Sequence, residues 1–206
     1  FTIVFGNLAK ISTDGVPQIL FYLCGVTLWN YFSDTLTKTS ETFTANANIF
    51  GKVYFPRMIV PLSVVVSNLI KLGVQFLLFI VIWAYYLIKG GDIHPNATLL
   101  LVPFLIVLMG FLGLAFGIII SSMTTKYRDL KFLVVVGVQL MMYASPIVYP
   151  LSTVPEKYKW LIVSNPVTSI IETFKYAFLG VGEFQWNYLA YSTCFTFILF
   201  FWGLII

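Results

Sequence analysis

Long, continuous runs of apolar residues constrain this chain more than any other feature of its sequence. The runs recur through the whole chain and do not alternate between apolar and polar residues. Lipid offers no water to unpaired backbone groups, so only helices and closed barrels cross a bilayer, and a helix needs about 20 apolar residues to do so. Barrel strands alternate, which these runs do not. The sequence therefore predicts a bundle of membrane-spanning helices.

The composition supports the same conclusion. Apolar residues make up 59% of the chain and charged residues only 10%, whereas a soluble domain has roughly 45–50% and 25%. Too few charges remain to cover a water-facing surface, which excludes an ordinary cytosolic enzyme, a disordered chain and a nucleic-acid-binding domain. The formal charge of +4 is then explained by cationic loops on one side of a membrane.

We expect an all-α, polytopic transmembrane bundle of six spans, the first of them truncated. The chain starts with Phe1 in a short apolar stub and stops at Ile206 within an apolar run, which suggests a fragment. The third run is longer than a hydrocarbon core of about 30 Å requires, so this span must tilt, bend or protrude. The predicted spans cover residues 1–9, 17–36, 58–88, 97–123, 132–149 and 188–206.

Two short helices are expected between the fifth and sixth spans. Thr153 and Glu156 have the spacing of a capping box, with Pro155 early in the first helix. The second helix starts at Asn165-Pro166 and ends at Gly180.

The second short helix has an amphipathic pattern. Apolar residues recur at every fourth position from Ile170, whereas Thr168, Glu172 and Lys175 fall on the other side. We therefore expect both short helices to lie at the membrane interface or to be re-entrant. The alternative is a packed hairpin outside the membrane.

The cationic residues near the span ends predict the orientation of the chain, because cytoplasmic loops carry an excess of Lys and Arg. The other three loops together carry five cations, namely Lys10, Lys89, Lys157, Lys159 and Lys175. This modest bias places the loops after spans two and four in the cytoplasm, and loops one, three and five outside. The cations of loops two and four are Lys38, Lys52, Arg57, Lys126, Arg128 and Lys131.

Few residues in the sequence could carry out a reaction. The one histidine, His94, lies in a short polar turn, where a histidine is more often solvated than a ligand. No cluster of His, Cys, Asp and Glu has metal-site spacing, and no G-x-x-x-x-G-K-[ST] loop is present for nucleotide phosphates. We expect no metal and no cofactor in this chain. If it uses ATP, another polypeptide binds the nucleotide.

Four residues within the predicted spans are candidates for a polar path. Asp34 and Lys71 are charges inside apolar runs, and such charges usually face a bundle interior or a wet cavity. The two residues can contact a polar substrate or form a structural pair. Alternatively, the long side chain of Lys71 can extend to the membrane interface. Trp29 and Tyr31 are aromatic residues whose faces suit sugars, although such residues also serve as membrane belts and lipid-facing bulk.

Two shorter patterns indicate packing and docking. Gly113 and Gly117 have the small-x-x-x-small spacing that lets helix backbones approach closely. In the loop after span two, an apolar segment flanked by Lys52 and Arg57 forms an element that can dock on a partner or turn along the membrane surface. The apolar residues of this segment are Ile49, Phe50, Val53, Tyr54 and Phe55.

Three segments together form a fairly specific combination. They are Asn48-Ile49-Phe50-Gly51-Lys52-Val53-Tyr54-Phe55-Pro56-Arg57 with Pro61-Leu62 after it, Tyr127-Arg128-Asp129-Leu130, and residues 144–151 with Val154-Pro155-Glu156 and Asn165-Pro166. The combination resembles the permeases of the ABC-2 family of ABC transporters, most closely the branch that exports polysaccharides such as O-antigen and teichoic acid. The match runs over nearly the whole chain.

The resemblance implies a multi-pass permease of the bacterial cytoplasmic membrane. It would work as a homodimer with two cytoplasmic ATPase subunits, which hold ATP and Mg²⁺, and would move a lipid-linked glycan between the two copies. Residues 1–206 would form a single permease domain, without the family's amino-terminal interface helix and most of its first span.

The resemblance also implies roles for particular residues. The paired short helices would lie on the outer side and include Pro155, Glu156, Asn165, Pro166, Glu172 and Lys175. Contacts with the ATPase would fall on Asn48, Ile49, Phe50, Lys52, Tyr54, Phe55, Arg57, Tyr127, Arg128 and Asp129.

Three other functions remain open. An ABC-2 efflux permease for drugs or lipids is the nearest. An intramembrane lipid-modifying enzyme would need a convergent set of polar residues within the spans. An ion-coupled transporter or channel would need broken helices and paired membrane acids.

Overall fold

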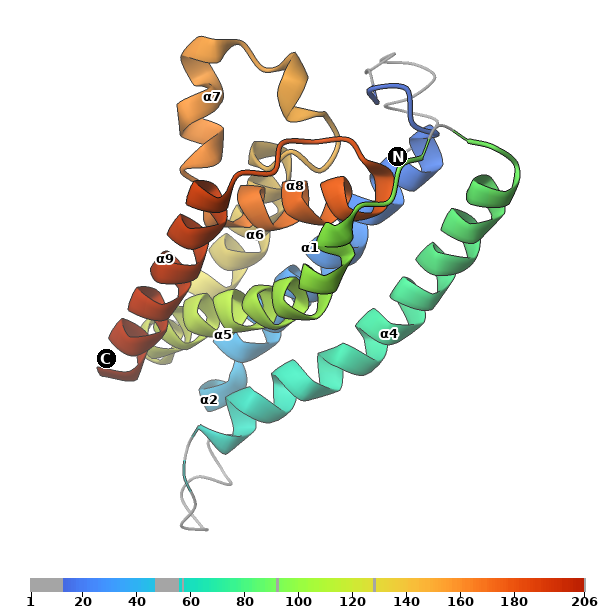
Figure 1. The fold of residues 1–206 in the computed structure, drawn as a ribbon. Helices are drawn as coiled ribbons and strands as arrows, with labels where there is room; N and C mark the ends of the chain where they lie inside the picture. Colours follow the sequence, from blue (N-terminus) through green and yellow to red (C-terminus); the bar gives the residue numbers. More distant parts are fainter. Residues whose placement is uncertain (1–12, 47–55, 57, 92, 128, 206) are drawn as a thin grey trace.

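The computed structural model describes residues 13–46, 56, 58–91, 93–127 and 129–205 (Figure 1). Every regular element in this part of the chain is a helix, which confirms the predicted all-α class. The elements are α1 (Gln18–Ser40), α2 (Thr42–Ala45), α4 (Ile59–Ile88), η2 (Ala97–Leu101), α5 (Val102–Lys126), α6 (Leu130–Ala144), η3 (Leu151–Thr153), α7 (Glu156–Val163), α8 (Pro166–Leu179) and α9 (Trp186–Ile205).

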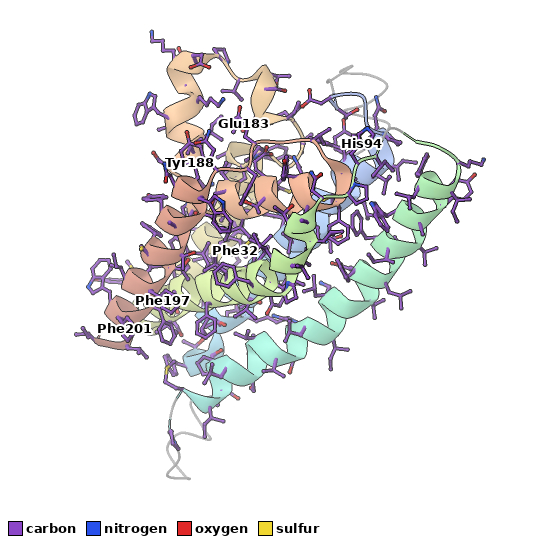
Figure 2. The ribbon with its side chains drawn as sticks, viewed as in Figure 1. Phe32, His94, Glu183, Tyr188, Phe197 and Phe201 are labelled. Carbon is purple, nitrogen blue, oxygen red and sulfur yellow. The ribbon has the colours of Figure 1, made fainter. Side chains whose placement is uncertain are left out.

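Three of the described helical segments are long and apolar enough to cross a membrane. They are α4, the stretch Ala97–Thr124 formed by η2 and α5, and α9. With 30 residues, α4 extends about 45 Å, which exceeds a hydrocarbon core of about 30 Å. On α9, Phe197 and Phe201 point away from the bundle, as lipid-facing residues do (Figure 2). The described part of the chain therefore supports three candidate spans of the predicted six.

α6 is shorter than the span predicted for residues 132–149. It has 15 residues, or about 22 Å. The helix ends at Ala144 because Ser145 precedes Pro146: a proline disfavours helical geometry in the residue before it, and Ser145 is extended, with φ −102° and ψ 147°. An irregular segment connects the end of α6 to η3.

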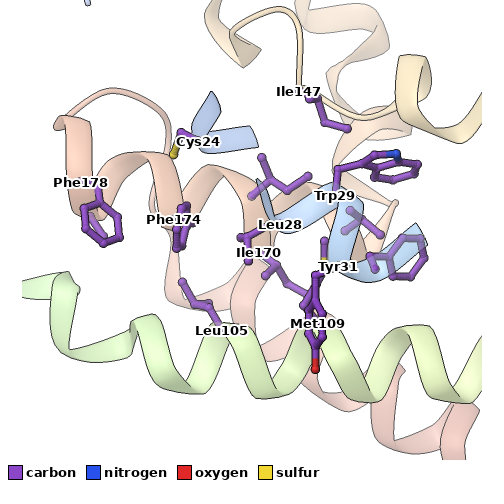
Figure 3. Close-up of a cluster of buried hydrophobic side chains, with 14 of the residues drawn as sticks. Cys24, Leu28, Trp29, Tyr31, Leu105, Met109, Ile147, Ile170, Phe174 and Phe178 are labelled. Atoms are coloured by element: carbon purple, nitrogen blue, oxygen red, sulfur yellow. The ribbon is translucent and has the colours of Figure 1, made fainter. Parts of the chain in front are cut away.

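α1 lies at the centre of the bundle. It packs against α4, α5, α6 and α8, and its side chains form one core with those of α5 and α8, which includes Leu28, Leu105 and Ile170 (Figure 3). Three of its four threonines are buried as well, and Thr27 satisfies its hydroxyl by donating to the Leu23 carbonyl at 2.7 Å. α4 behaves differently, since it buries only four of its residues and exposes long apolar side chains.

Glycines on α5 allow α1 to approach closely, as the glycine spacing predicts. A Cβ atom at Gly117 would lie 2.5 Å from the Cβ of Thr39, and one at Gly113 would lie 3.1 Å from the Phe32 carbonyl oxygen. Gly110 extends the same face, against the Tyr31 hydroxyl. Any larger residue at these positions would push α1 outward.

α8 contradicts the prediction of an interfacial helix with an exposed polar side, and its re-entrant position stays a prediction. All but one of its 14 residues are buried, and it lies across α1, α5 and α9 (Figure 1). The polar side that suggested solvent is buried because Glu172 and Lys175 satisfy each other inside the protein. The predicted ends are confirmed: Asn165 caps the helix by accepting from the Val167 amide, and Gly180 closes it with φ 75°.

α7 starts near the predicted position but without the predicted capping box. Thr153 belongs to η3, and its hydroxyl donates to the Pro150 carbonyl at 2.8 Å. Pro155 therefore occupies the N-cap position, with no side-chain cap. α7 buries none of its residues, so the two short helices have opposite environments.

The connecting segments gather at two opposite ends of the bundle. At one end Thr124 donates to the Ser40 carbonyl at 2.9 Å, and Lys131 lies 4.0 Å from Glu41, which joins the loop after α1 to the loop after α5. At the other end Ser152 donates to Asp14, and the His94 amide donates to the Leu179 carbonyl. This is the grouping predicted for loops two and four against loops one, three and five.

We expect Gly117→Leu to destabilise the protein by about 1–3 kcal/mol, because overpacking a close helix contact costs that much. Gly137→Leu is the control, since nothing lies within 4 Å of a Cβ at that position. Thermal unfolding in detergent measures both. Equal melting temperatures for the two variants would contradict the close α1–α5 contact.

Candidate functional site

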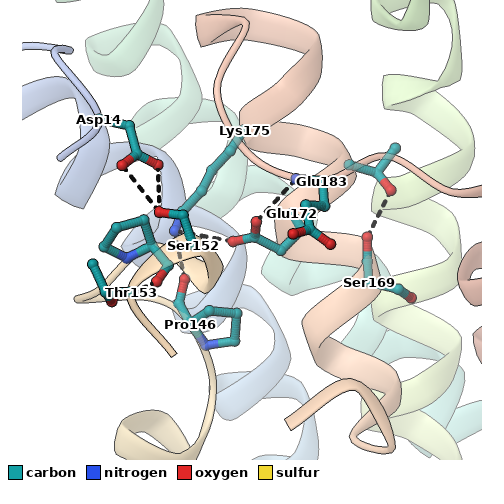
Figure 4. A network of polar contacts seen from close by, with 10 residues as sticks. Asp14, Pro146, Ser152, Thr153, Ser169, Glu172, Lys175 and Glu183 are labelled. Atoms are coloured by element: carbon teal, nitrogen blue, oxygen red, sulfur yellow. Dashed lines mark hydrogen bonds and ion pairs between the residues drawn. The ribbon is translucent and has the colours of Figure 1, made fainter. Parts of the chain in front are cut away.

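A buried ion pair on α8 forms the most polar cluster in the interior of the described chain (Figure 4). Glu172 is 2% exposed and Lys175 is fully buried. The Lys175 ammonium donates to Glu172 at 3.4 Å and to the Pro146 carbonyl, and it lies 3.8 Å from the centre of the Phe21 ring. Glu172 also accepts from the Glu183 amide at 3.3 Å. The pair thus joins α1, the segment after α6, and the loop before α9.

Burial sets the electrostatics of this pair. Removal from water raises the pKa of Glu172 and lowers the pKa of Lys175, while the opposite charge of each partner acts against these shifts. A buried charge is tolerated only when partners and hydrogen bonds replace its water. Here a carbonyl, an amide and an aromatic face provide that replacement.

The carboxyl end of α8 is also fully paired. Its last four carbonyls have no partner within the helix. The Gly180 amide donates to the Tyr176 carbonyl at 3.1 Å, and residues of α4 and of the segment 93–96 supply the other donors. The bonds are Asn96 to Tyr176 and Ala177, Trp83 to Phe178 at 2.8 Å, and His94 to Leu179. The loop that holds His94 therefore closes α8 and fixes it against α4.

Asp34 and Lys71 lie together, as the sequence allowed. They form an ion pair between α1 and α4, with 28% and 53% of their side chains exposed. Two further bonds extend this seam, because Lys38 donates to Asn68 at 2.8 Å and Asn68 donates to Thr35 at 3.2 Å. A line of polar groups thus runs between two otherwise apolar helices.

The two aromatic candidates for a substrate path are buried. Trp29 and Tyr31 are each 3% exposed; Trp29 packs against Phe32, and Tyr31 against Gly110. A substrate can reach them only if the helices around α1 separate. Their role in a path stays a prediction.

The predicted coupling residues lie mostly outside the described residues: Asn48, Ile49, Phe50, Lys52, Tyr54, Phe55, Arg57 and Arg128. The two that are described lie at one end of the bundle. Tyr127 follows α5 and is exposed, and Asp129 occupies the N-cap position of α6. Their contact with an ATPase also stays a prediction.

The residues predicted for the outer short helices divide between surface and interior. Glu156 is exposed at the start of α7. Asn165 donates to Ser145 at 2.9 Å, and the Pro166 carbonyl accepts from Ser192 at 2.9 Å, which ties the start of α8 to α9.

Sequence reasoning missed several residues of these clusters. Asn68 is three residues before Lys71, on the same face of α4, so the helical period could have identified it. The Pro146 carbonyl and the Phe21 ring carry no sequence signal, because a backbone acceptor and an apolar ring become partners only through tertiary packing.

The described residues contain no group of three or more His, Cys, Asp and Glu side chains that could hold a metal ion. The polar groups instead join helices to one another. Such an arrangement can position and transmit movement between helices, and its exposed apolar faces suit lipid.

A comparison of the sequence with family models decides the class of protein. Residues 1–179 match the model of the ABC-2 type transporter. The chain belongs to the ABC-2 type transporter family. The match includes α1 to α8, so the buried α8 and its ion pair lie within the family's domain.

This ABC-2 chain is similar to proteins named for O-antigen export and for polysialic acid transport. It is 35% identical to an O-antigen export system permease protein RfbA of Klebsiella pneumoniae, over 85% of this chain and 67% of that protein. A second K. pneumoniae RfbA is 30% identical, over 91% and 68%. The polysialic acid transport protein KpsM of Escherichia coli is 20% identical, over 98% and 76%.

We expect Lys175→Met to destabilise the protein by about 3–5 kcal/mol, because it leaves the Glu172 charge buried without its partner. The double variant Glu172→Gln with Lys175→Met should lose less stability, since no charge remains buried at this site. Lys159→Met is the matched control: its pair with Glu183 is partly exposed and contributes about 0–1 kcal/mol. Thermal unfolding measures all three, and equal losses for Lys175→Met and Lys159→Met would refute the role of burial.

Proposed function

We propose that this chain is the membrane-spanning permease subunit of an ABC exporter that moves a lipid-linked polysaccharide across the bacterial cytoplasmic membrane. The observation that carries the proposal is its 35% identity to an O-antigen export permease over most of the chain. In this proposal residues 1–206 form one permease domain with six spans: residues 1–9, α1, α4, α5, α6 with the segment after it, and α9.

A separate ATPase supplies the energy in this mechanism. The sequence contains no phosphate-binding loop, so ATP and Mg²⁺ belong to the partner. The loop after α1 and the loop after α5 lie at one end of the bundle, where a single partner can contact both. A loop responds to the ATPase cycle only if it binds the two ATPase states with different affinity. Residues Asn48 to Arg57 and Tyr127 to Asp129 are the proposed contacts.

The polar sugars of a glycan cannot cross hydrocarbon unaided, so transport needs a path that the protein opens. We assign this path to the space between two copies of the chain, as a homodimer. The seam of Asp34 and Lys71 is partly exposed and is the first polar surface a glycan meets there. Trp29 and Tyr31 join the path when α1 moves away from α5.

A reconstitution tests the proposal. We expect inverted vesicles that contain the permease and its ATPase to take up the lipid-linked glycan when ATP is added. Vesicles that contain only the permease should neither take up glycan nor hydrolyse ATP. Uptake of drugs or small lipids with no uptake of glycan would contradict the proposal and favour an efflux permease.

The coupling contact is tested in the same vesicles by Arg57→Glu, which should reduce uptake about tenfold, equivalent to about 1.4 kcal/mol of lost coupling. Lys157→Glu reverses a charge on α7, at the other end of the bundle, and should leave ATP-driven glycan uptake unchanged. An equal loss of uptake in the two variants would refute the assigned contact.

A further inference from the structure

A groove lies between α7 and α9, outside the clusters described above. Its volume is about 430 Å³, within the roughly 300–1,000 Å³ of typical small-molecule sites. Trp160 of α7 and Ser164, which follows this helix, form one wall, and Tyr188 and Tyr191 of α9 form the other. Tyr188 of the groove lies at the same end of the bundle as Glu183 (Figure 2).

Two contacts hold α7 in position over α9. The Lys159 ammonium pairs with Glu183, in the loop before α9, and the hydrogen bond to Glu183 raises the pKa of Lys159. At the other end of α7 the Tyr191 hydroxyl donates to the Ser164 carbonyl at 3.0 Å. The groove is therefore formed within one chain and does not depend on a partner.

Aromatic exposure on this groove is unusual for a packing role. Trp160 is 68% exposed, although burial of an indole ring stabilises a protein more than burial of most side chains. α7 buries none of its residues, so Trp160 does not anchor the helix. Its flat face, with the rings of Tyr188 and Tyr191 opposite, suits a ligand that is apolar on one face and polar at its edges.

The charges of the groove select between possible ligands. Lys159 is already paired with Glu183, and Glu156 adds a further carboxylate to the lining. This balance disfavours an anionic phosphate headgroup, which binds best beside unpaired cations. It suits a neutral ligand whose hydroxyls both donate to carboxylates and accept from tyrosine and lysine.

We propose that the groove between α7 and α9 binds a neutral pyranose unit of the exported glycan, with the sugar stacked on Trp160. The C–H face of the sugar lies on the indole ring, and its hydroxyls reach Glu156 and the tyrosine hydroxyls. This inference rests on the polysaccharide substrate proposed above. In this proposal the groove contacts the glycan where the glycan leaves the membrane.

Saturation-transfer NMR tests the site directly. The probes are the methyl pyranosides of glucose, galactose, mannose and N-acetylglucosamine, added to the permease–ATPase complex in phosphatidylcholine nanodiscs. We expect transfer to at least one glycoside and a loss of affinity of roughly two- to tenfold in Trp160→Ala. Trp160→Phe retains a ring and should retain most of the binding. Tyr158→Ala is the matched control, because Tyr158 is on the same helix, is 55% exposed and does not line the groove.

Three results would overturn the site: no transfer to any of the four glycosides, equal binding by Trp160→Ala and Tyr158→Ala, or displacement of the sugar when phosphatidylglycerol is added to the nanodiscs. The last would make the groove a lipid headgroup site. Vesicle uptake of glycan separates this inference from the proposed function. A complex that binds glycosides but moves no glycan would refute the function and keep the site, and the reverse result would refute only the site.

Discussion

The close contact between α1 and the glycines of α5 is the constraint on which the rest of the structure depends. Gly113 and Gly117 bring the two helix backbones together where no side chain fits. α1 can then occupy the centre of the bundle, with α4 on one side and α8 on another. In lipid, where apolar surface alone does not drive helices together, close backbone packing and interhelical hydrogen bonds decide which helices associate.

The buried α8 connects this centre to the end of the bundle that we propose faces the outside. Lys175 contacts the Phe21 ring of α1 and the Pro146 carbonyl, while Glu172 holds the Glu183 amide. Glu183 in turn pairs with Lys159 of α7. A displacement of α1 can therefore reach the groove between α7 and α9 through a continuous set of side-chain and backbone contacts. This continuity gives the proposed exporter a physical link between its central helix and its outer surface.

The sequence predicted what local patterns determine. The apolar runs located α4, the stretch Ala97–Thr124 and α9 to within two residues at each end, and the Asn165 cap and Gly180 located the ends of α8. It failed where tertiary partners decide. Glu172 and Lys175 suggested a solvent-exposed face because charged side chains are normally exposed. Only the folded chain shows that the two form an ion pair in the interior. Thr153 suggested a capping box, but its hydroxyl has a nearer acceptor in the Pro150 carbonyl. The burial of Tyr31 likewise depends on Gly110 of α5, which lies far away in the sequence.

The central claim is that the two ends of the bundle face opposite sides of the membrane, with the loops after α1 and α5 on the cytoplasmic side, where the ATPase binds. Cysteine labelling in spheroplasts measures this directly, in a background with Cys24→Ala and Cys194→Ala. A membrane-impermeant maleimide should label His94→Cys in intact spheroplasts and Tyr127→Cys only after permeabilisation. Labelling of Tyr127→Cys in intact spheroplasts, with His94→Cys protected until permeabilisation, would contradict the account.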